Sequence, residues 1–167
     1  MTPSFPMRDI EKASRDFEET YVRHVDMLYR VCFSYIKNVF DTEDIVADVF
    51  VKLLKHKKVF QDAEHEKAWL LRTAINQCKD YLKHWSRNCV NIDNYQNLKT
   101  DNNYYADETL TAILDLPERY KVVIYLYYYE GYSSIEIAKA LKKPQSTILN
   151  HLHEGRKYLK GVLLNEE

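Results

Sequence analysis

The chain has 167 residues, of which 46% are hydrophobic and 29% are charged, so it is long enough for one domain or two small ones with apolar cores. Only 3 Gly and 4 Pro are present, too few for the turns of a β-sandwich, a barrel or a glycine-rich nucleotide fold. No apolar run approaches the roughly 20 residues of a membrane span, and residues 1–15 lack a signal-peptide core. The composition predicts an all-α protein that stays in the cytoplasm, without membrane insertion.

No constellation of catalytic or metal-binding residues is recognisable. The three cysteines form no C-x-x-C pair, and Cys32 and Cys78 fall at apolar helical spacings that indicate core positions. His151 and His153 are two residues apart, whereas a metal-binding pair on a helix needs i, i+4 spacing. Neither a G-x-G-x-x-G loop nor a G-x-S-x-G elbow occurs. We therefore predict no enzyme activity, no metal, no cofactor and no small-molecule substrate.

The net charge of −1 hides segments of opposite sign. Residues 41–48 contain four acids and no base, whereas residues 72–87 contain four bases and one acid. Residues 142–160 contain five bases and one acid. Phosphate binding depends on local Lys and Arg density rather than on total charge, so the two basic segments are compatible with nucleic-acid binding.

A change of composition divides the chain into two parts. Residues 88–107 contain six Asn and few apolar residues, and they follow neither a helical nor a strand period. We predict a flexible linker there, between a helical domain over residues 10–87 and a smaller helical domain over residues 108–163.

Three amphipathic helices are predicted in the first domain. The first has apolar residues at steps of three and four over residues 17–36. The second begins at Asp41 as N-cap and buries an apolar stripe over residues 45–54, which leaves Asp44 and Asp48 on the opposite face.

The third helix is predicted from about residue 66 to residue 87, with two distinct faces. Its apolar face includes Trp69, which this position marks as a core residue rather than a platform for a stacked base. Its other face is polar and basic, and is formed by Arg72, Asn76, Lys79 and Lys83.

The second domain begins with an ambiguous segment. Residues 122–129 are rich in strand formers, and propensity alone favours a strand. The flanks favour a helix of about thirteen residues, because Asp115-Leu-Pro-Glu118 supplies an N-cap, an early Pro and an acid, and Glu130-Gly131 supplies a stop.

The remainder of this domain has a helix-turn-helix pattern. Ser133-Ser-Ile-Glu136 is a capping box that opens a short helix through Leu141. A break at Lys142-Lys143-Pro144 follows, and a last helix runs from about Gln145 to Leu163. Two helices joined by a tight turn over ~20 residues are typical of domains whose second helix enters the major groove.

Six segments, taken together and in this order, resemble one known family. They are Asp41-Thr-Glu-Asp-Ile-Val-Ala-Asp-Val-Phe50, Ala68-Trp-Leu-Leu-Arg72, Asp80-Tyr-Leu-Lys83, Leu116-Pro-Glu-Arg-Tyr120, Tyr129-Glu-Gly-Tyr-Ser133 and Glu136-Ile-Ala138. The chain resembles bacterial RNA polymerase sigma factors of the extracytoplasmic-function (ECF) group over about residues 15–160. The resemblance implies a noncatalytic subunit that binds core RNA polymerase and promoter DNA, with an anti-sigma factor as a further partner.

In the first domain, the resemblance implies binding to the polymerase clamp and melting of the minus-ten element. Asp44 and Asp48 would meet the core enzyme, although a merely solvated acidic face is the alternative, and Ala47 replaces the usual Gln. The minus-ten DNA would be bound by a loop over residues 61–66 and by the basic helix face, unless the lysines only solubilise that helix. These minus-ten residues are Gln61, Asp62, His65, Arg72, Asn76, Lys79 and Lys83.

In the second domain, the resemblance implies binding to the minus-thirty-five element. Base contacts would come from Gln145, Ser146 and Asn150, and phosphate contacts from Lys142, Lys143 and Arg156. The last helix departs from the family pattern, because Leu149, His151 and Glu154 stand where the family usually has basic residues. We therefore expect weak binding to duplex DNA. We also expect a strained turn, because Lys142 replaces Gly or Asn, and stronger binding toward pH 6, because an ordinary His pKa is about 6.5.

A function of a different class remains open at this point. A stand-alone helix-turn-helix transcriptional regulator would also carry the second domain, with a first domain that dimerises or senses a ligand. Such a protein must bind duplex DNA tightly by itself, and it needs neither the acidic face nor the basic face of the first domain. Association with core RNA polymerase discriminates between the two hypotheses.

Overall fold

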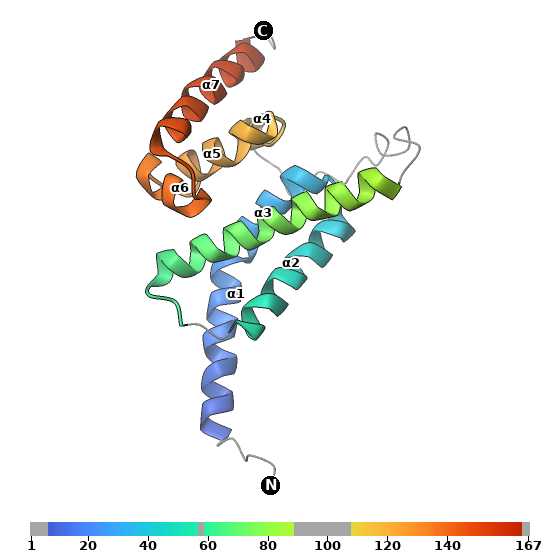
Figure 1. Ribbon diagram of the computed structural model, residues 1–167, viewed down its shortest axis with the longest axis vertical. Helices are drawn as coiled ribbons and strands as arrows, with labels where there is room; N and C mark the ends of the chain where they lie inside the picture. The colour runs from blue at the N-terminus through green and yellow to red at the C-terminus, as the bar shows by residue number, and fades with distance from the viewer. Residues whose placement is uncertain (1–6, 57–58, 89–107, 165–167) are drawn as a thin grey trace.

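In the computed structural model, the described residues are 7–56, 59–88 and 108–164, and within these ranges the chain is helical with no strand (Figure 1). The helices are α1 (Met7–Ile36), α2 (Val39–Lys55), α3 (Ala63–Asn88), α4 (Glu108–Leu114), α5 (Glu118–Tyr128), α6 (Ser134–Leu141) and α7 (Gln145–Leu164). The predicted all-α fold is confirmed. Apart from Asn88, which ends α3, the predicted linker lies outside the described residues, as does Cys89.

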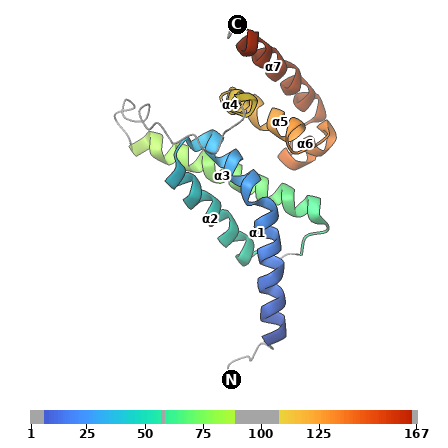
Figure 2. The same ribbon diagram turned by 180° about the vertical axis from the view of Figure 1, so that it is seen from behind.

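Helices α1, α2 and α3 pack together as the first domain, and the N-terminal half of α1 extends beyond them (Figures 1 and 2). Their shared core includes Leu28 from α1, Val49 from α2 and Leu70 from α3, all fully buried. Cys32 and Cys78 are buried in this core, as predicted from their spacing.

The beginning of α2 differs from the prediction. Asn38, not Asp41, is the N-cap, and its Oδ1 accepts a hydrogen bond from the Asp41 N–H at 3.0 Å. The chain reverses immediately after α1 at Lys37, whose φ is 58°, so the helix starts earlier than Asp41 alone suggested. The apolar stripe ends earlier too, because Leu54 is 64% exposed.

The beginning of α3 also lies earlier than predicted, at Ala63. Asp62 provides the cap, since its Oδ1 accepts a hydrogen bond from the His65 N–H at 2.7 Å. His65 therefore belongs to the first turn of the helix rather than to a loop, and the loop before α3 ends at Asp62.

The ambiguous segment of the second domain is a helix, as its flanks predicted. Its N-cap is Pro117, which makes no side-chain cap hydrogen bond, and Gly131 follows the helix at a φ of +69°. Asp115 does not cap this helix but pairs with Lys37 Nζ of the first domain at 2.9 Å. Helix α4, which was not predicted, precedes it. The strand formers are explained by burial, because α5 is covered on all sides over residues 120–126.

Helices α6 and α7 form the predicted helix-turn-helix. The capping box of Ser133 and Glu136 is present, and α6 ends at Leu141 as expected. Lys142 adopts the left-handed conformation with a φ of 52°, which confirms the strained turn. Gly155 lets α7 approach α5 closely, because a Cβ at this position would lie 2.7 Å from Ile124 Cγ1.

The second domain packs on one side of α3, chiefly through α6, and α5 also touches α1 (Figures 1 and 2). Lys121 is buried at this junction, where its Nζ donates to the main-chain oxygen of Ser34 and lies 5.0 Å from the centre of the Tyr35 ring. Lys67 adds an ion pair to Glu130, with Nζ 3.5 Å from Oε2. Arg72 on the polar face of α3 reaches the main-chain oxygen of Ala140 in α6, so this face looks toward the helix-turn-helix.

Candidate nucleic-acid interface

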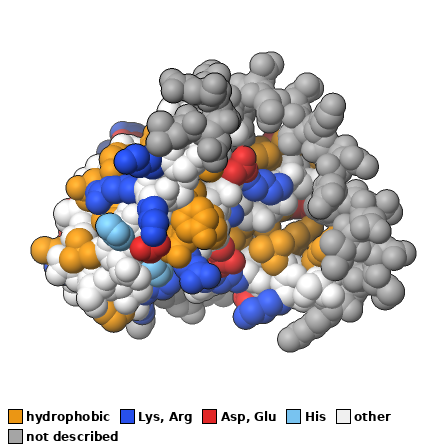
Figure 3. All heavy atoms as spheres, turned by 90° about the horizontal axis from the view of Figure 1, so that it is seen from above, with side chains coloured by type: hydrophobic (Ala, Val, Ile, Leu, Met, Phe, Trp, Pro, Cys, Tyr) orange, Lys and Arg blue, Asp and Glu red, His pale blue; other side chains and the backbone are white. Residues whose placement is uncertain are grey.

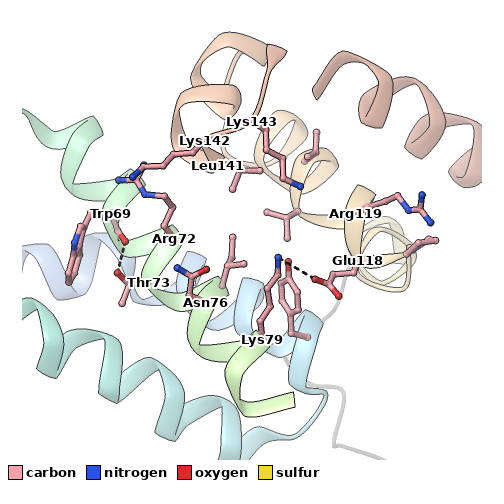
Figure 4. A pocket seen from close by; sticks show the side chains of 15 residues that line it. Trp69, Arg72, Thr73, Asn76, Lys79, Glu118, Arg119, Leu141, Lys142 and Lys143 are labelled. Carbon is pink, nitrogen blue, oxygen red and sulfur yellow. Dashed lines mark hydrogen bonds and ion pairs between the residues drawn. The ribbon is translucent and has the colours of Figure 1, made fainter. Parts of the chain in front are cut away.

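A cleft with a volume of about 780 Å³ separates α3 from α5 and from the turn between α6 and α7 (Figure 4). Both domains contribute basic side chains to its lining, and Glu118 is the one carboxylate among the lining residues. These basic residues are Arg72, Lys79, Arg119, Lys142 and Lys143. The structure thus brings together three of the predicted minus-ten residues, counting Asn76, and two of the predicted minus-thirty-five residues.

Arg72 connects the two domains directly. Its Nη1 donates to the main-chain oxygens of Ala140 at 3.2 Å and Lys139 at 3.5 Å. These carbonyls belong to the last turn of α6, where the helix dipole is negative; the Lys139 oxygen also accepts from the Lys142 N–H at 3.3 Å. In this arrangement, Arg72 caps α6.

The remaining predicted residues on the polar face of α3 differ in their surroundings. Lys79 Nζ lies 3.6 Å from Glu118 Oε1, so this lysine also contacts the second domain. Asn76 is exposed beside the cleft, whereas Lys83 is exposed further along α3 and does not line the cleft. Two of the four side chains on this face are consequently engaged between the domains.

Gln61, Asp62 and His65 lie together at the N-terminal end of α3. The Gln61 N–H donates to His65 Nδ1 at 3.3 Å, and the His65 ring meets Phe60 edge-on, with the ring centres 5.6 Å apart. Trp69 packs on the same cluster, 5.7 Å from the Phe60 ring. Its half-buried position fits the predicted core role, although one edge of Trp69 also lines the cleft.

The predicted minus-thirty-five residues are exposed but are not all free. Gln145 Nε2 donates to Ser134 Oγ at 3.1 Å, which ties the start of α7 to the start of α6. Ser146 and Asn150 are exposed on α7.

Arg156 is held against the end of α5. Its Nε donates to Tyr128 Oη at 2.7 Å, and its guanidinium lies 5.3 Å from the centre of the Tyr127 ring. Arg156 does not line the cleft, so the structure separates it from Lys142 and Lys143.

The premise of the binding expected near pH 6, an ordinary pKa for His151, is wrong. His151 is half-buried against Tyr120, with their ring centres 5.7 Å apart. Burial lowers the pKa of His151, and the positive charges of Lys143 and Arg119 lower it further. Protonation of His151 is therefore less favourable than protonation of an exposed imidazole.

Asp44 and Asp48 lie one turn apart on α2 and are exposed, as predicted. Sequence reasoning missed two apolar residues on the same helix, Phe40 and Val51, which are 78% and 44% exposed. Phe40, Asp44, Ala47 and Val51 follow one another at steps of four, three and four, so they share one side of α2. This spacing was the available signal, but it was hidden by the stronger buried stripe.

Contacts between the domains were also missed. Lys37, Lys67 and Lys121 each reach a partner on the other domain, and nothing in their sequence context distinguishes them from solvating lysines. The distances between partners in the sequence, up to 87 residues, explain why no local pattern reports them.

Comparison with known proteins separates the two hypotheses that the sequence left open. The family model described as Sigma-70 region 2 matches residues 20–87, and the one described as Sigma-70, region 4 matches residues 106–159. RNA polymerase sigma factor SigV of Bacillus subtilis is 29% identical over 147 residues, covering 86% of this chain and 89% of SigV. ECF RNA polymerase sigma factor SigW of the same organism is 26% identical over 176 residues, covering 94% of each chain.

The chain belongs to the ECF sigma factors. As a sigma factor it binds core RNA polymerase and directs promoter recognition, and the stand-alone regulator is not favoured, because that alternative does not account for the match to region 2. Among the described residues of this sigma factor, no helix is both long and apolar enough to cross a membrane.

Solved structures share the fold of this sigma factor. RpoE of Bartonella quintana, determined in complex with the anti-sigma factor NepR, matches with a TM-score of 0.69 and 20% identity over 92% of this chain and 99% of the other. CnrH, determined with the cytosolic domain of CnrY, matches with a TM-score of 0.64 and 20% identity over 92% of this chain and 91% of the other.

Proposed function

We propose that this sigma factor uses three separate surfaces at a promoter. Asp44 and Asp48 on α2 bind the core enzyme, the polar face of α3 binds the minus-ten element, and the helix-turn-helix binds the minus-thirty-five element. The observation that carries this assignment is the division of α3 into a buried face, with Leu70 and Ala74, and a polar face that is continuous along the helix. The minus-ten surface also includes Gln61, Asp62 and His65 at the N-terminal end of α3.

In the arrangement described above, called closed from here on, the second domain packs against α3. This closed arrangement is incompatible with promoter contact by every one of these residues at once. Arg72 is bound to the end of α6 and Lys79 to Glu118, so both must leave their partners before they reach DNA. Binding to the core enzyme through α2 leaves the cleft unobstructed, because Asp44 and Asp48 do not line it. We therefore infer that the domains are separated when this sigma factor is bound to promoter DNA.

The remaining roles follow from the family. The sigma factor has no catalytic activity of its own and acts in the cytoplasm, where the polymerase is. An anti-sigma factor is a further partner, a proposal supported by the complexes in which the similar proteins RpoE and CnrH were determined.

Core association tests the central assignment. The double substitution Asp44→Arg with Asp48→Arg should abolish capture of the full chain by core RNA polymerase, since both side chains are exposed and the fold does not depend on them. The matched control is Glu11→Arg with Asp16→Arg, which makes the same change of charge on the exposed part of α1. Equal capture of the Asp44/Asp48 variant and the unaltered chain would remove the assignment.

A further inference from the structure

The cleft between the domains concentrates positive charge that the described residues do not balance. Arg72 and Lys142 extend toward one another from opposite sides, and Lys143 points into the opening (Figure 4). Glu118 is the carboxylate of this lining, and Lys79 already pairs with it. Like charges that converge from two domains repel one another, and the repulsion opposes the closed arrangement.

The cations that converge here still have hydrogen-bonding capacity. The two bonds from Arg72 to α6 use Nη1, and a guanidinium has five N–H groups. Lys142 and Lys143 are both exposed to the cleft, and each ammonium carries three donors. Seen from above, several Lys and Arg side chains lie among hydrophobic ones on this face of the molecule (Figure 3). The pKa of His151 is lowered by burial first, and the positive charges of Lys143 and Arg119 in this lining lower it further.

The volume of the cleft and the apolar part of its lining indicate what kind of anion fits. A volume of about 780 Å³ lies within the roughly 300–1,000 Å³ of small-molecule sites. Beside the cations, the lining contains the apolar side chains of Ile75, Val122 and Leu141, with Trp69 at one end. A ligand that matches both halves combines several negative charges with a flat, weakly polar ring.

We propose that the cleft binds a nucleoside polyphosphate, with its phosphates on Arg72, Lys142 and Lys143 and its base on the apolar side. Both domains contribute to this site, so the bound ligand neutralises the repulsion and holds the domains closed. Because Arg72 is also assigned to promoter DNA, ligand and promoter compete for it. This last consequence rests on the proposed function, whereas the binding itself does not.

Calorimetric titration of the full chain in magnesium-free, low-salt buffer tests the site without polymerase or promoter. The probes are ATP, inorganic triphosphate and adenosine. We expect ATP to bind more tightly than triphosphate and adenosine not to bind, since charge supplies most of the affinity and the ring adds to it. Equal affinity of ATP and triphosphate would overturn the assignment of the base, and absence of binding by both would overturn the site.

Variants that replace lysine by the uncharged glutamine test where ATP binds. Lys142→Gln with Lys143→Gln should weaken ATP binding at least tenfold, because it removes two of the three proposed phosphate partners. Lys52→Gln with Lys55→Gln, an equal change of charge at the end of α2, should leave it unchanged. Equal weakening of ATP binding by both pairs would show only a non-specific attraction between ATP and positive charge, and would overturn the site.

A second measurement concerns closure. Small-angle X-ray scattering should give a smaller radius of gyration with ATP than without it, and the Lys142/Lys143 variant should lose this difference. An unchanged radius on binding would overturn the claim that the ligand holds the domains closed.

A titration with an acidic peptide is a separate experiment. Binding of the peptide without binding of ATP would overturn the nucleotide and indicate a protein segment as the ligand. Failure of core capture by the unaltered chain, in contrast, would affect the proposed function alone.

Discussion

The close approach of α7 to α5 at Gly155 gives a prediction whose magnitude can be worked out from the structure. A Cβ added at Gly155 would lie 2.7 Å from Ile124 Cγ1 and 2.9 Å from Cδ1, well inside ordinary contact. Ile124 is fully buried, so it cannot turn away into solvent. Overpacking of this kind costs about 1–3 kcal/mol, while Ala gains about 1 kcal/mol over Gly in a helix interior. Gly155→Ala should therefore lower the free energy of unfolding by up to about 2 kcal/mol.

Gly161 in the same helix is the matched control. A Cβ there would meet nothing within 4 Å, so Gly161→Ala should raise the free energy of unfolding by about 0.5–1 kcal/mol. Urea unfolding of the two variants, followed by circular dichroism, measures both changes. In an Ile124→Ala background, the cost of Gly155→Ala should shrink, because the clashing atoms are gone. If the two glycine variants were equally stabilised, the close packing of α5 and α7 would be refuted.

Three further results are expected. Asn76→Ala with Lys83→Ala should reduce permanganate reactivity of the minus-ten element more than it reduces core binding, and normal melting would return this face to a solubilising role. Burial, reinforced by Lys37, lowers the pKa of Lys121 to about 8 from 10.5, so the unfolded chain binds more protons between these values. Stability from this group should rise as pH increases from 8 to 10.5, and Lys121→Met should flatten that rise in urea unfolding. Glu154→Arg should tighten binding of the full chain to a minus-thirty-five duplex and steepen its salt slope by about 0.9, and an unchanged slope would show that residue 154 does not face phosphate.

Local signals predicted most of the fold. The capping box at Ser133, the stop at Gly131 and the strained turn at Lys142 are each decided by a few neighbouring residues, and all three are confirmed. The errors occurred where two local signals competed. Asp41 and Asn38 are equally good caps, and the turn at Lys37, which selects Asn38, depends on the packing of α2 against α1.

The candidate site was predictable as a set of residues but not as an arrangement. The spacing of Arg72, Asn76, Lys79 and Lys83 reports a common helix face, because those positions recur within one helix. The position of that face opposite Lys142 depends on packing between the domains, which no spacing within either domain encodes. For the same reason, the expectation of an ordinary pKa for His151 was wrong, since His151 is half-buried against Tyr120, 31 residues earlier in the chain.

Helix α5 has an unusual consequence for how this sequence tolerates change. Its residues from Tyr120 to Leu126 are all buried, so no polar face alternates with an apolar one. In α2, by contrast, buried and exposed positions follow the helical repeat. A saturation mutagenesis scan should therefore show an unbroken block of intolerant positions across residues 120–126, but a periodic pattern across α2. Viable substitutions in that block should be limited to apolar residues of similar volume, so α5 is the part of the second domain whose sequence can drift least.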